Sequence, residues 1–334
     1  MRKIGLIYGG RSTEHDGSVE TKKGVMAGVN QEIYPVVDLI FIDRENNVFL
    51  NEEKISMGAL MDRIKANQDV FYFNLMPGNE GEDGAWSGLF EICDGVGSFE
   101  SVNTASILMN KYQQSELATI LLPDIALCPK SVLLQRHMKP EEINRLVDKF
   151  DQEVIIKPNN MGSSHFMDLF MPSEKARIQE FLVKLFEYDQ AAIVQAFIEG
   201  DNYSCGVYRA KDGQKALPVV FQKIRDRFMS HAVKFGGPWD KVIVDHDIAK
   251  RIQILSMKLA EIFDVTGMCR FDYVAKGDDI YFLEGNLVPS LAPTGSYNFM
   301  LKAGGVDFND FISEIIYSFD NKVKNNKLLV YNAE

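Results

Sequence analysis

The sequence has few cysteines and lacks the motifs of several common enzyme classes. Its four cysteines, in 334 residues, include no CxxC pair, so we expect free thiols in a reducing compartment rather than a disulfide framework. GxGxxG and the P-loop motif are absent, which removes the two commonest nucleotide-binding loops and the main support for an NAD-dependent oxidoreductase. The absence of GxSxG argues against a serine hydrolase, and the absence of HExxH argues against a histidine-ligated metal.

Positive charge and long apolar runs are also scarce. The formal net charge is -11, which argues against nucleic-acid binding because that function needs a basic face. No apolar run is long enough to span a bilayer, so no membrane partner is expected. "MRKIGLIYGG" passes directly into a short strand and a glycine turn, unlike a signal peptide, and we therefore expect a cytoplasmic protein.

The order of strands and helices predicts an α/β part followed by α+β parts. In residues 1–105, three apolar strands alternate with helical segments, which is typical of a doubly wound parallel sheet. Residues 106–200 and 201–334 mix strands and helices differently and are predicted to form two α+β domains. "NTASILMNKYQQSELA", residues 103–118, is predicted to be one helix.

An acidic patch is predicted near the C-terminal end. Side chains alternate along a strand, so Arg270 shares one face with Asp272 in "CRFDYVA", and Glu284 shares one with Asn286 in "IYFLEGN". "KGDD" between the two strands reads as a turn. If the strands pair, two carboxylates and an amide oxygen converge, which suits Mg²⁺. The alternative is a solvated hairpin, but apolar neighbours indicate burial, and buried acids need a partner or a metal.

Three lysines and a polar turn are candidates for phosphate binding. Lys157 ends an apolar strand, and Ser163 and Ser164 follow in a Gly-Ser-Ser turn whose N–H groups and hydroxyls suit phosphate oxygens. Lys111 and Lys234 are each consistent with an ordinary solvated charge, as is the turn with a surface hairpin. Together with the acidic patch, they are consistent with a nucleoside triphosphate site.

Taken in order along the chain, five stretches resemble the D-alanine–D-alanine ligase family of the ATP-grasp superfamily. "GGRSTEH" is similar to the family's GGxSxEH, "GEDGAWSGLFE" to GEDGxxQGxLE, and "MNK" to MDK. "IIKPNNMGSS" is similar to VVKPxxxGSS, and "RFDY" with "IYFLEGNLVPS" to RxDF with xYxLExNxxPG. The resemblance spans nearly the whole chain. It implies an ATP-grasp fold with a Rossmann-like first domain, ATP held between the second and third domains, and a homodimer.

The resemblance also implies roles for individual residues. Two Mg²⁺ ions, or Mn²⁺, would lie on Asp272, Glu284 and Asn286. ATP would be held by Lys111, Lys157, Ser164, Gln195, Phe197, Ile198, Asn202 and Lys234, with Asn202 at the ribose in place of the family's acid. Glu14 would bind the amino group of the first amino acid, and Ser163 would help to position it. Arg270 and a backbone N–H near Ser290 would stabilise the tetrahedral oxyanion.

The sequence departs from the family pattern where the two amino acids would bind. Ser290 replaces a glycine, Gly295 replaces a serine, with Ser296 adjacent, and Phe235 replaces a tyrosine. Pro77 stands for a histidine, and Phe166, in the phosphate loop, stands for a glycine. The pattern predicts an ATP-dependent carboxylate–amine ligase with altered acceptor specificity. Two alternatives are a ligase that joins D-alanine to a hydroxy acid and a non-catalytic nucleotide-binding homologue.

Overall fold

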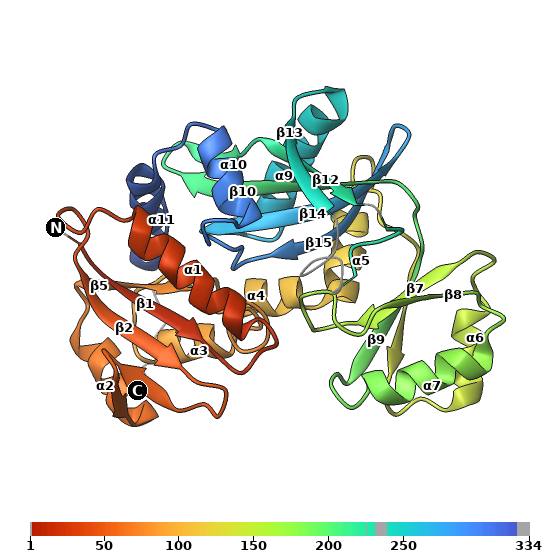
Figure 1. Ribbon diagram of the computed structural model, residues 1–334, viewed down its shortest axis with the longest axis horizontal. Helices are drawn as coiled ribbons and strands as arrows, with labels where there is room; N and C mark the ends of the chain where they lie inside the picture. The colour runs from red at the N-terminus through yellow and green to blue at the C-terminus, as the bar shows by residue number, and fades with distance from the viewer. Residues whose placement is uncertain (1, 225, 231–238, 326–334) are drawn as a thin grey trace, which may run out of the picture.

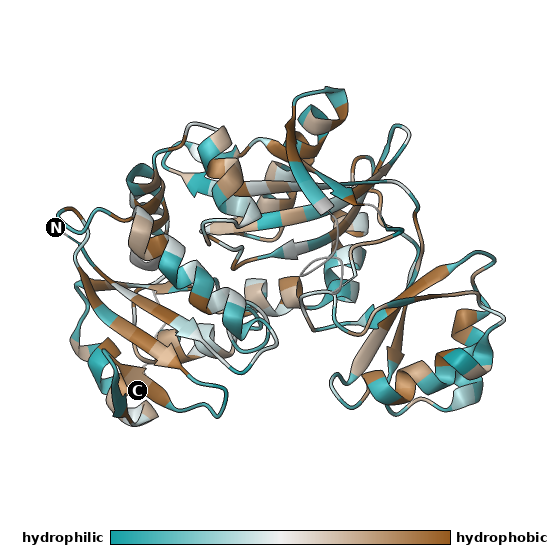
Figure 2. Ribbon diagram, in the orientation of Figure 1, coloured by the Kyte–Doolittle hydropathy of each residue, from teal (hydrophilic) through white to brown (hydrophobic). Residues whose placement is uncertain are grey.

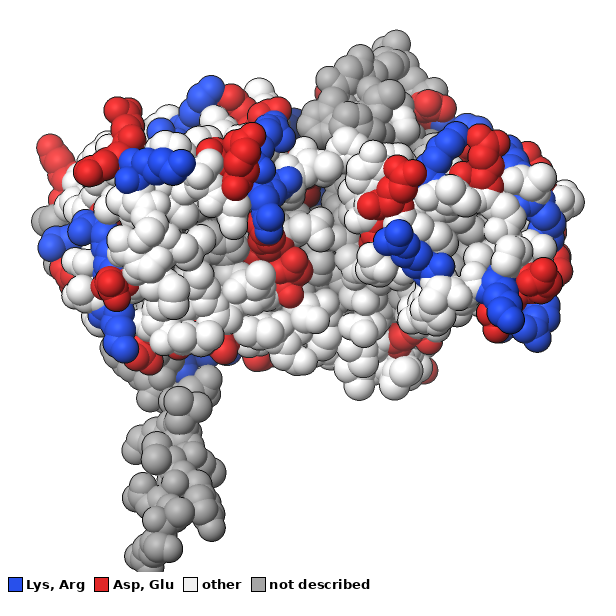
Figure 3. All heavy atoms as spheres, turned by 90° about the horizontal axis from the view of Figure 1, so that it is seen from below, with Lys and Arg blue, Asp and Glu red and all other residues white. Residues whose placement is uncertain are grey.

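The computed structural model describes residues 2–224, 226–230 and 239–325, and these residues form three sheets with helices packed on them (Figure 1). None of the helices in the described part of the chain combines the length and apolar character needed to cross a bilayer. On the face in Figure 3, the described residues mix Lys and Arg with Asp and Glu rather than forming one basic stripe.

The first sheet is mostly parallel and has the strand order β4-β3-β2-β1-β5. β1 pairs in parallel with β2 and β5, as predicted, but β3 and β4 form an antiparallel hairpin edge that the sequence analysis missed. Asn51 and Glu52 both take positive φ in its two-residue turn, as tight hairpins require. The elements are β1 (Lys3–Gly9), β2 (Val36–Ile42), β3 (Val48–Leu50), β4 (Glu53–Ile55), β5 (Val70–Asn74), α1 (His15–Gly28), α2 (Met57–Ala66) and α3 (Ala85–Ile92).

Helices cover both faces of this sheet. On one face, Ile4 and Leu6 of β1 pack in one core with Val25 of α1. On the other face, Ile7 packs in a second core with Trp86 of α3. A parallel sheet that is buried on both sides has two apolar faces. The helices on both faces confirm the predicted doubly wound arrangement.

The central sheet is antiparallel, has the order β6-β9-β7-β8 and carries two helices. Leu182 of α7 and Ile143 of α6 pack with Val154 and Val194 in one core. Figure 2 shows apolar residues along these strands and mixed colours on the helices, as helices with one buried face require. The elements are β6 (Ser131–Gln135), α6 (Pro140–Val147), β7 (Val154–Pro158), β8 (Asp168–Phe170), α7 (Lys175–Leu185) and β9 (Ala191–Ala196).

The third sheet is antiparallel and has the order β13-β12-β10-β14-β15, with β11 paired to β10. Helix α9 packs against one face, and α10 and α11 lie in a core that also includes the first sheet. The elements are β10 (Asp201–Ala210), β11 (Gly213–Ala216), β12 (Val219–Ile224), β13 (Trp239–Val244), α9 (Asp247–Ile262), β14 (Met268–Lys276), β15 (Asp279–Asn286), α10 (Ser296–Ala303) and α11 (Phe308–Asn325).

The single helix predicted over 103–118 is wrong: the segment forms α4 (Val102–Met109) and α5 (Lys111–Leu121). Asn110 interrupts the helix with φ -89° and ψ 101°, and its side chain accepts the backbone N–H of Gln113, so it caps α5. Ala105 and Ala118 pack in the core of the third sheet. The break places Lys111 at the first turn of α5, beside the cleft described below.

Candidate functional site

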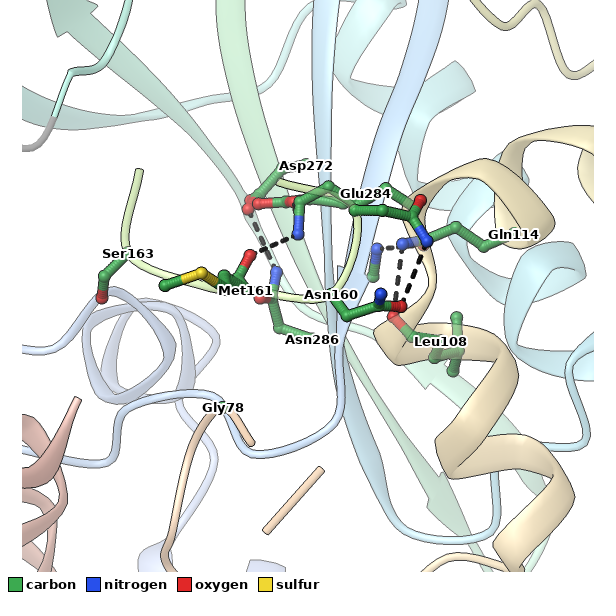
Figure 4. Close-up of polar contacts among 12 residues, drawn as sticks. Gly78, Leu108, Gln114, Asn160, Met161, Ser163, Asp272, Glu284 and Asn286 are labelled. Atoms are coloured by element: carbon green, nitrogen blue, oxygen red, sulfur yellow. Dashed lines mark hydrogen bonds and ion pairs between the residues drawn. The ribbon is translucent and has the colours of Figure 1, made fainter. Parts of the chain in front are cut away.

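The acidic patch lies on the paired strands β14 and β15. Register places Asp272 opposite Glu284 and Arg270 opposite Asn286, so the pairing and shared face expected from side-chain alternation are confirmed. Asn286 donates from Nδ2 to Asp272 Oδ2 at 3.3 Å. Figure 4 shows Asp272, Glu284 and Asn286 close to one another, with Ser163 farther along a neighbouring loop.

A hydrogen-bond network holds Asp272 in place. Arg270 donates to it from Nε at 2.9 Å and from the guanidinium terminus at 2.7 Å. Ser204 of β10 donates to the same carboxylate and accepts from Gln222 of β12 at 2.6 Å. Burial alone would lower the pKa of Arg270, but the charge and hydrogen bonds of Asp272 raise it above its ordinary value. Three neighbouring strands therefore orient one carboxylate.

Two lysines approach the patch from other elements. Lys157, at the end of β7, is 9% exposed, and burial lowers its pKa to about 8 although Glu284 opposes the shift. Lys111 Nζ lies 3.3 Å from Glu284 Oε2 and donates to the carbonyl of Met161 at 2.6 Å. The third predicted lysine, Lys234, lies outside the described residues.

One cleft brings most of the predicted ATP site together. It is lined by all the predicted ATP-binding residues in the described part of the chain and by four of the other predicted site residues: Lys111, Lys157, Ser164, Gln195, Phe197, Ile198, Asn202, Ser163, Arg270, Asp272 and Glu284. Asn286 lines a small adjoining cavity. Glu14 and Ser290 do not line this cleft. The cleft lies between the central sheet and the third sheet. Strands β7 and β9 supply residues to one wall, and β10, β14 and β15 supply residues to the other.

The sequence analysis missed an arginine that lines this cleft. Arg227 lies 5.1 Å from the ring centroid of Phe197 and forms an ion pair with Glu153 at 2.7 Å. A guanidinium over an aromatic face is a favourable cation–π arrangement. "RDRF" carries no motif that would single out Arg227, because its role depends on two residues at distant positions in the chain.

The loop at residues 161–167, here called the cleft loop, meets the first sheet. Ser163 Oγ donates to Glu14 Oε1 at 2.6 Å. A Cβ on Gly162 would lie 2.3 Å from Glu14 Oε2, so a larger residue there would displace this carboxylate from its present position. Glu14 precedes α1 and makes no side-chain cap bond there, which favours a binding role over helix capping.

Glu82 is a buried acid that the sequence analysis did not single out within its glycine-rich loop. It accepts the backbone N–H of Gly78 at 2.6 Å and that of Val288 at 2.8 Å. Burial, followed by the charge of Glu14, raises its pKa to about 7. Glu82 thereby connects the loop before α3 to the segment that follows β15 and carries Ser290.

The structure links the departures at Ser290 and Gly295. The hydroxyl of Ser290 lies 3.2 Å from Thr21 Oγ1 and accepts the N–H of Ala292 at 3.3 Å. A Cβ on Gly295 would lie 2.4 Å from the carbonyl oxygen of Ser290 and 2.8 Å from its Oγ. Glycine at 295 is therefore required by the way the chain folds around Ser290.

The acidic patch fits a hard cation, although it is not a dense carboxylate cluster. In the described ranges, no group of three or more His, Cys, Asp or Glu side chains is placed to hold a metal. Asp272 and Glu284 are instead balanced by Arg270 and Lys111. Two carboxylates and an amide leave coordination positions open, which suits Mg²⁺ because this ion usually retains waters and phosphate oxygens.

Comparison with known proteins agrees with this arrangement. The sequence profile of the D-ala D-ala ligase C-terminus matches residues 123–317, more than half of the chain. The D-alanine–D-alanine ligase of Phocaeicola vulgatus is 23% identical over 327 residues, covering 94% of this chain and 98% of its own. That of Enterococcus faecalis is 25% identical over 359 residues, covering 96% and 100%.

Two solved ligase structures have an overall fold similar to that of this chain. VanG D-Ala:D-Ser ligase from Enterococcus faecalis has a TM-score of 0.79 at 21% identity, covering 95% of this chain and 99% of its own. The D-alanine–D-alanine ligase from Bacillus anthracis complexed with ATP has a TM-score of 0.77 at 20% identity, covering 97% and 99%. These likenesses establish the fold predicted from the sequence. The profile match shows that this chain belongs to the D-alanine–D-alanine ligase family.

Proposed function

We propose that this chain is an ATP-dependent ligase that joins two amino acids through an acyl phosphate. A carboxylate oxygen of the first amino acid attacks the γ-phosphorus of ATP, and ADP leaves. The amine of the second then attacks the acyl carbon, phosphate leaves, and the amine loses a proton. The observation that carries the proposal is one cleft in which Asp272 and Glu284 face Lys111 and Lys157.

The residues on the phosphate side neutralise charge. Lys157 and Lys111 would approach the phosphate oxygens, Lys234 would join them, and the backbone and hydroxyl of Ser164 would donate hydrogen bonds. Asp272, Glu284 and Asn286 would hold two Mg²⁺ ions, or Mn²⁺, which when bound supply charge neutralisation at the transferring phosphoryl group. Gln195, Phe197 and Ile198 would contact the adenine and Asn202 the ribose.

The residues on the amino-acid side orient the substrates. Glu14 would accept a hydrogen bond from the ammonium group of the first amino acid. Ser163 orients the carboxylate of Glu14 by donating a hydrogen bond of 2.6 Å to it. Arg270 would stabilise the oxyanion of the tetrahedral intermediate together with a backbone N–H near Ser290. The hydroxyl of Ser290 lies 3.2 Å from Thr21 Oγ1, so the proposal assigns only the backbone N–H in this segment to the oxyanion.

The second amino acid is proposed to differ from D-alanine. Ser290, Gly295, Phe235 and Pro77 depart from the family pattern at positions that the resemblance assigns to the amino-acid end, whereas the phosphate-binding lysines and the metal residues are retained. Phe235 lies outside the described residues; loss of a tyrosine hydroxyl there favours a hydroxy-acid acceptor and an ester product as the alternative.

The test is product identification from ATP, Mg²⁺ and pooled substrates. Phosphate release and mass spectrometry with D- and L-amino acids and hydroxy acids should reveal a dipeptide, or an ester if the alternative holds. Fast turnover with D-alanine alone would refute altered specificity. If no substrate pair leads to ATP consumption, the non-catalytic nucleotide-binding homologue is favoured. The retained Arg270, Asp272, Glu284 and Asn286 argue against that homologue because binding alone does not require all four together.

The proposal includes three broader expectations. Domain boundaries would lie near residues 105 and 200, the second of these at the start of β10. The protein would act in the cytoplasm, where ATP and free amino acids are available, and would form a homodimer. Sedimentation analysis tests the last expectation, because a monomer at the working concentration would contradict it.

A further inference from the structure

The cleft loop contains three residues in an unfavourable backbone conformation. Ser163, Ser164 and Phe166 have φ values of 57°, 55° and 50°. Residues with a side chain rarely take this left-handed conformation, and surrounding contacts must stabilise them when they do. The family pattern has glycine at position 166, which would take this φ without strain, so Phe166 needs a local explanation.

The chain just before the cleft loop is anchored to the turn at residues 186–190, between α7 and β9. Asp189 is 7% exposed and accepts the backbone N–H of Asn160 at 2.7 Å and its Nδ2 at 3.0 Å. Asp189 also accepts the N–H of Ala191 at 3.2 Å, which connects it to β9. The start of the loop is therefore fastened to the central sheet.

The end of the cleft loop is anchored to the same turn. The ring of Phe166 stacks on that of Tyr188, with centroids 4.5 Å apart and planes at 26°. Tyr188 is 61% exposed, so its outer face contributes no core packing. Phe166 also packs against the core of the central sheet. Adjacent residues of one turn thus hold both ends of the loop.

Between these anchors, the loop makes the contacts that complete the site. The carbonyl of Met161 accepts from Lys111, and Ser163 donates to Glu14. Without an anchor at residue 166, the strained residues would relax and the positions of both contacts would change. We propose that Phe166 and Tyr188 form an aromatic clamp of positioning residues that holds the cleft loop in the shape that receives the phosphates of ATP. This inference rests on the proposed function for the identity of the ligand.

The clamp is tested first without any substrate. Hydrogen exchange of the peptide that contains the cleft loop should be about two- to tenfold faster in Tyr188→Ala, the range that corresponds to loss of one aromatic pair. Tyr188→Phe keeps the ring and should restore slow exchange. Tyr317→Ala removes another exposed tyrosine, on α11, and should leave the loop unchanged. Unchanged exchange in Tyr188→Ala would overturn the clamp.

The positioning role is tested by ATP affinity. Titration with ATP and Mg²⁺ should give a Kd about two- to tenfold higher for Tyr188→Ala, with recovery in Tyr188→Phe. Phe166→Ala should weaken binding at least as much, since Phe166 also packs on the core, and adding Tyr188→Ala to Phe166→Ala should weaken it no further because the shared contact is already gone. Additive losses, or an unchanged Kd, would overturn the role. A wild-type protein without ligase activity would refute the proposed function and leave the exchange result standing.

Discussion

The phosphate side and the amino-acid side of the site are built from different kinds of structure. Asp272, Glu284 and Arg270 stand on the adjacent strands β14 and β15, and their spacing follows from strand register. Glu14 and Ser163 lie outside strands and meet across 149 residues of sequence. The metal residues on the strands keep the family pattern, and so do Glu14 and Ser163, whereas the departures at Ser290 and Gly295 lie between β15 and α10. Strand register thus fixes the spacing of the charges, whereas the amino-acid side depends on how separate loops meet.

The two sides differ in electrostatics as well. On the phosphate side, each acid has a cation beside it: Arg270 with Asp272, and Lys111 with Glu284. On the amino-acid side, Glu82 accepts the backbone N–H groups of Gly78 and Val288, and burial, followed by the charge of Glu14, raises its pKa to about 7. One side is therefore balanced before ligands arrive, and the other is set to receive a cation such as an ammonium group.

The largest effect should come from the phosphate side. Asp272→Asn removes a proposed metal ligand and leaves Arg270 without its carboxylate, so we expect phosphate release to fall at least about 100-fold. The matched control is Asp279→Asn, which changes an exposed acid at the start of β15, next to the turn that joins β14 and β15. Activity above a tenth of the wild type would contradict the assignment, and thermal unfolding of the same samples would identify a variant that fails to fold.

A smaller loss is expected on the amino-acid side. Glu14→Gln removes a charged acceptor, so the KM for the first amino acid should rise about 10- to 100-fold, while the KM for ATP changes little. Glu20→Gln, on the exposed face of α1, is the control. Equal increases in both KM values would mean that the two sides are not separable.

The segment that carries Ser290 and Gly295 should not tolerate the serine that the family pattern has at position 295. Gly295→Ser would bring a Cβ to 2.4 Å from the carbonyl oxygen of Ser290, so the free energy of unfolding should fall by about 1–3 kcal/mol. Gly17→Ser is the control, since nothing lies within 4 Å of a Cβ at that position. A Gly295→Ser protein as stable as the control would show that this loop is freer than its contacts indicate.

The smallest effect should be a pH dependence at Lys157. Its pKa is lowered to about 8, so the free protein loses this charge above pH 8, and the Kd for ATP should rise by at most about tenfold per pH unit. Between pH 8 and the ordinary value of 10.5, the unfolded chain binds more protons, so the free energy of unfolding should increase with pH in that window. Lys157→Met should remove the contribution of Lys157 to both dependences. If the wild type and Lys157→Met have the same pH profiles for the Kd of ATP and for the free energy of unfolding, this role of Lys157 is refuted.

Sequence reasoning went furthest where one local rule determines position. Alternation placed Asp272 and Glu284 correctly because every second residue of a strand faces the same side. It failed at the helix over 103–118, because the cap formed by Asn110 competes with a helical pattern that looks continuous. It also missed the β3–β4 hairpin, since strands of three residues carry too little pattern.

The sequence by itself determined the pairing of β14 with β15, the acidic patch on them and the family resemblance, because each depends on residues close together in the chain or on ordered motifs. Only the tertiary structure decided that Ser163 meets Glu14, that Glu82 joins Gly78 to Val288, and that Tyr188 stacks on Phe166. These contacts join loops distant in sequence, and their geometry is set by how the sheets pack, which no local pattern records.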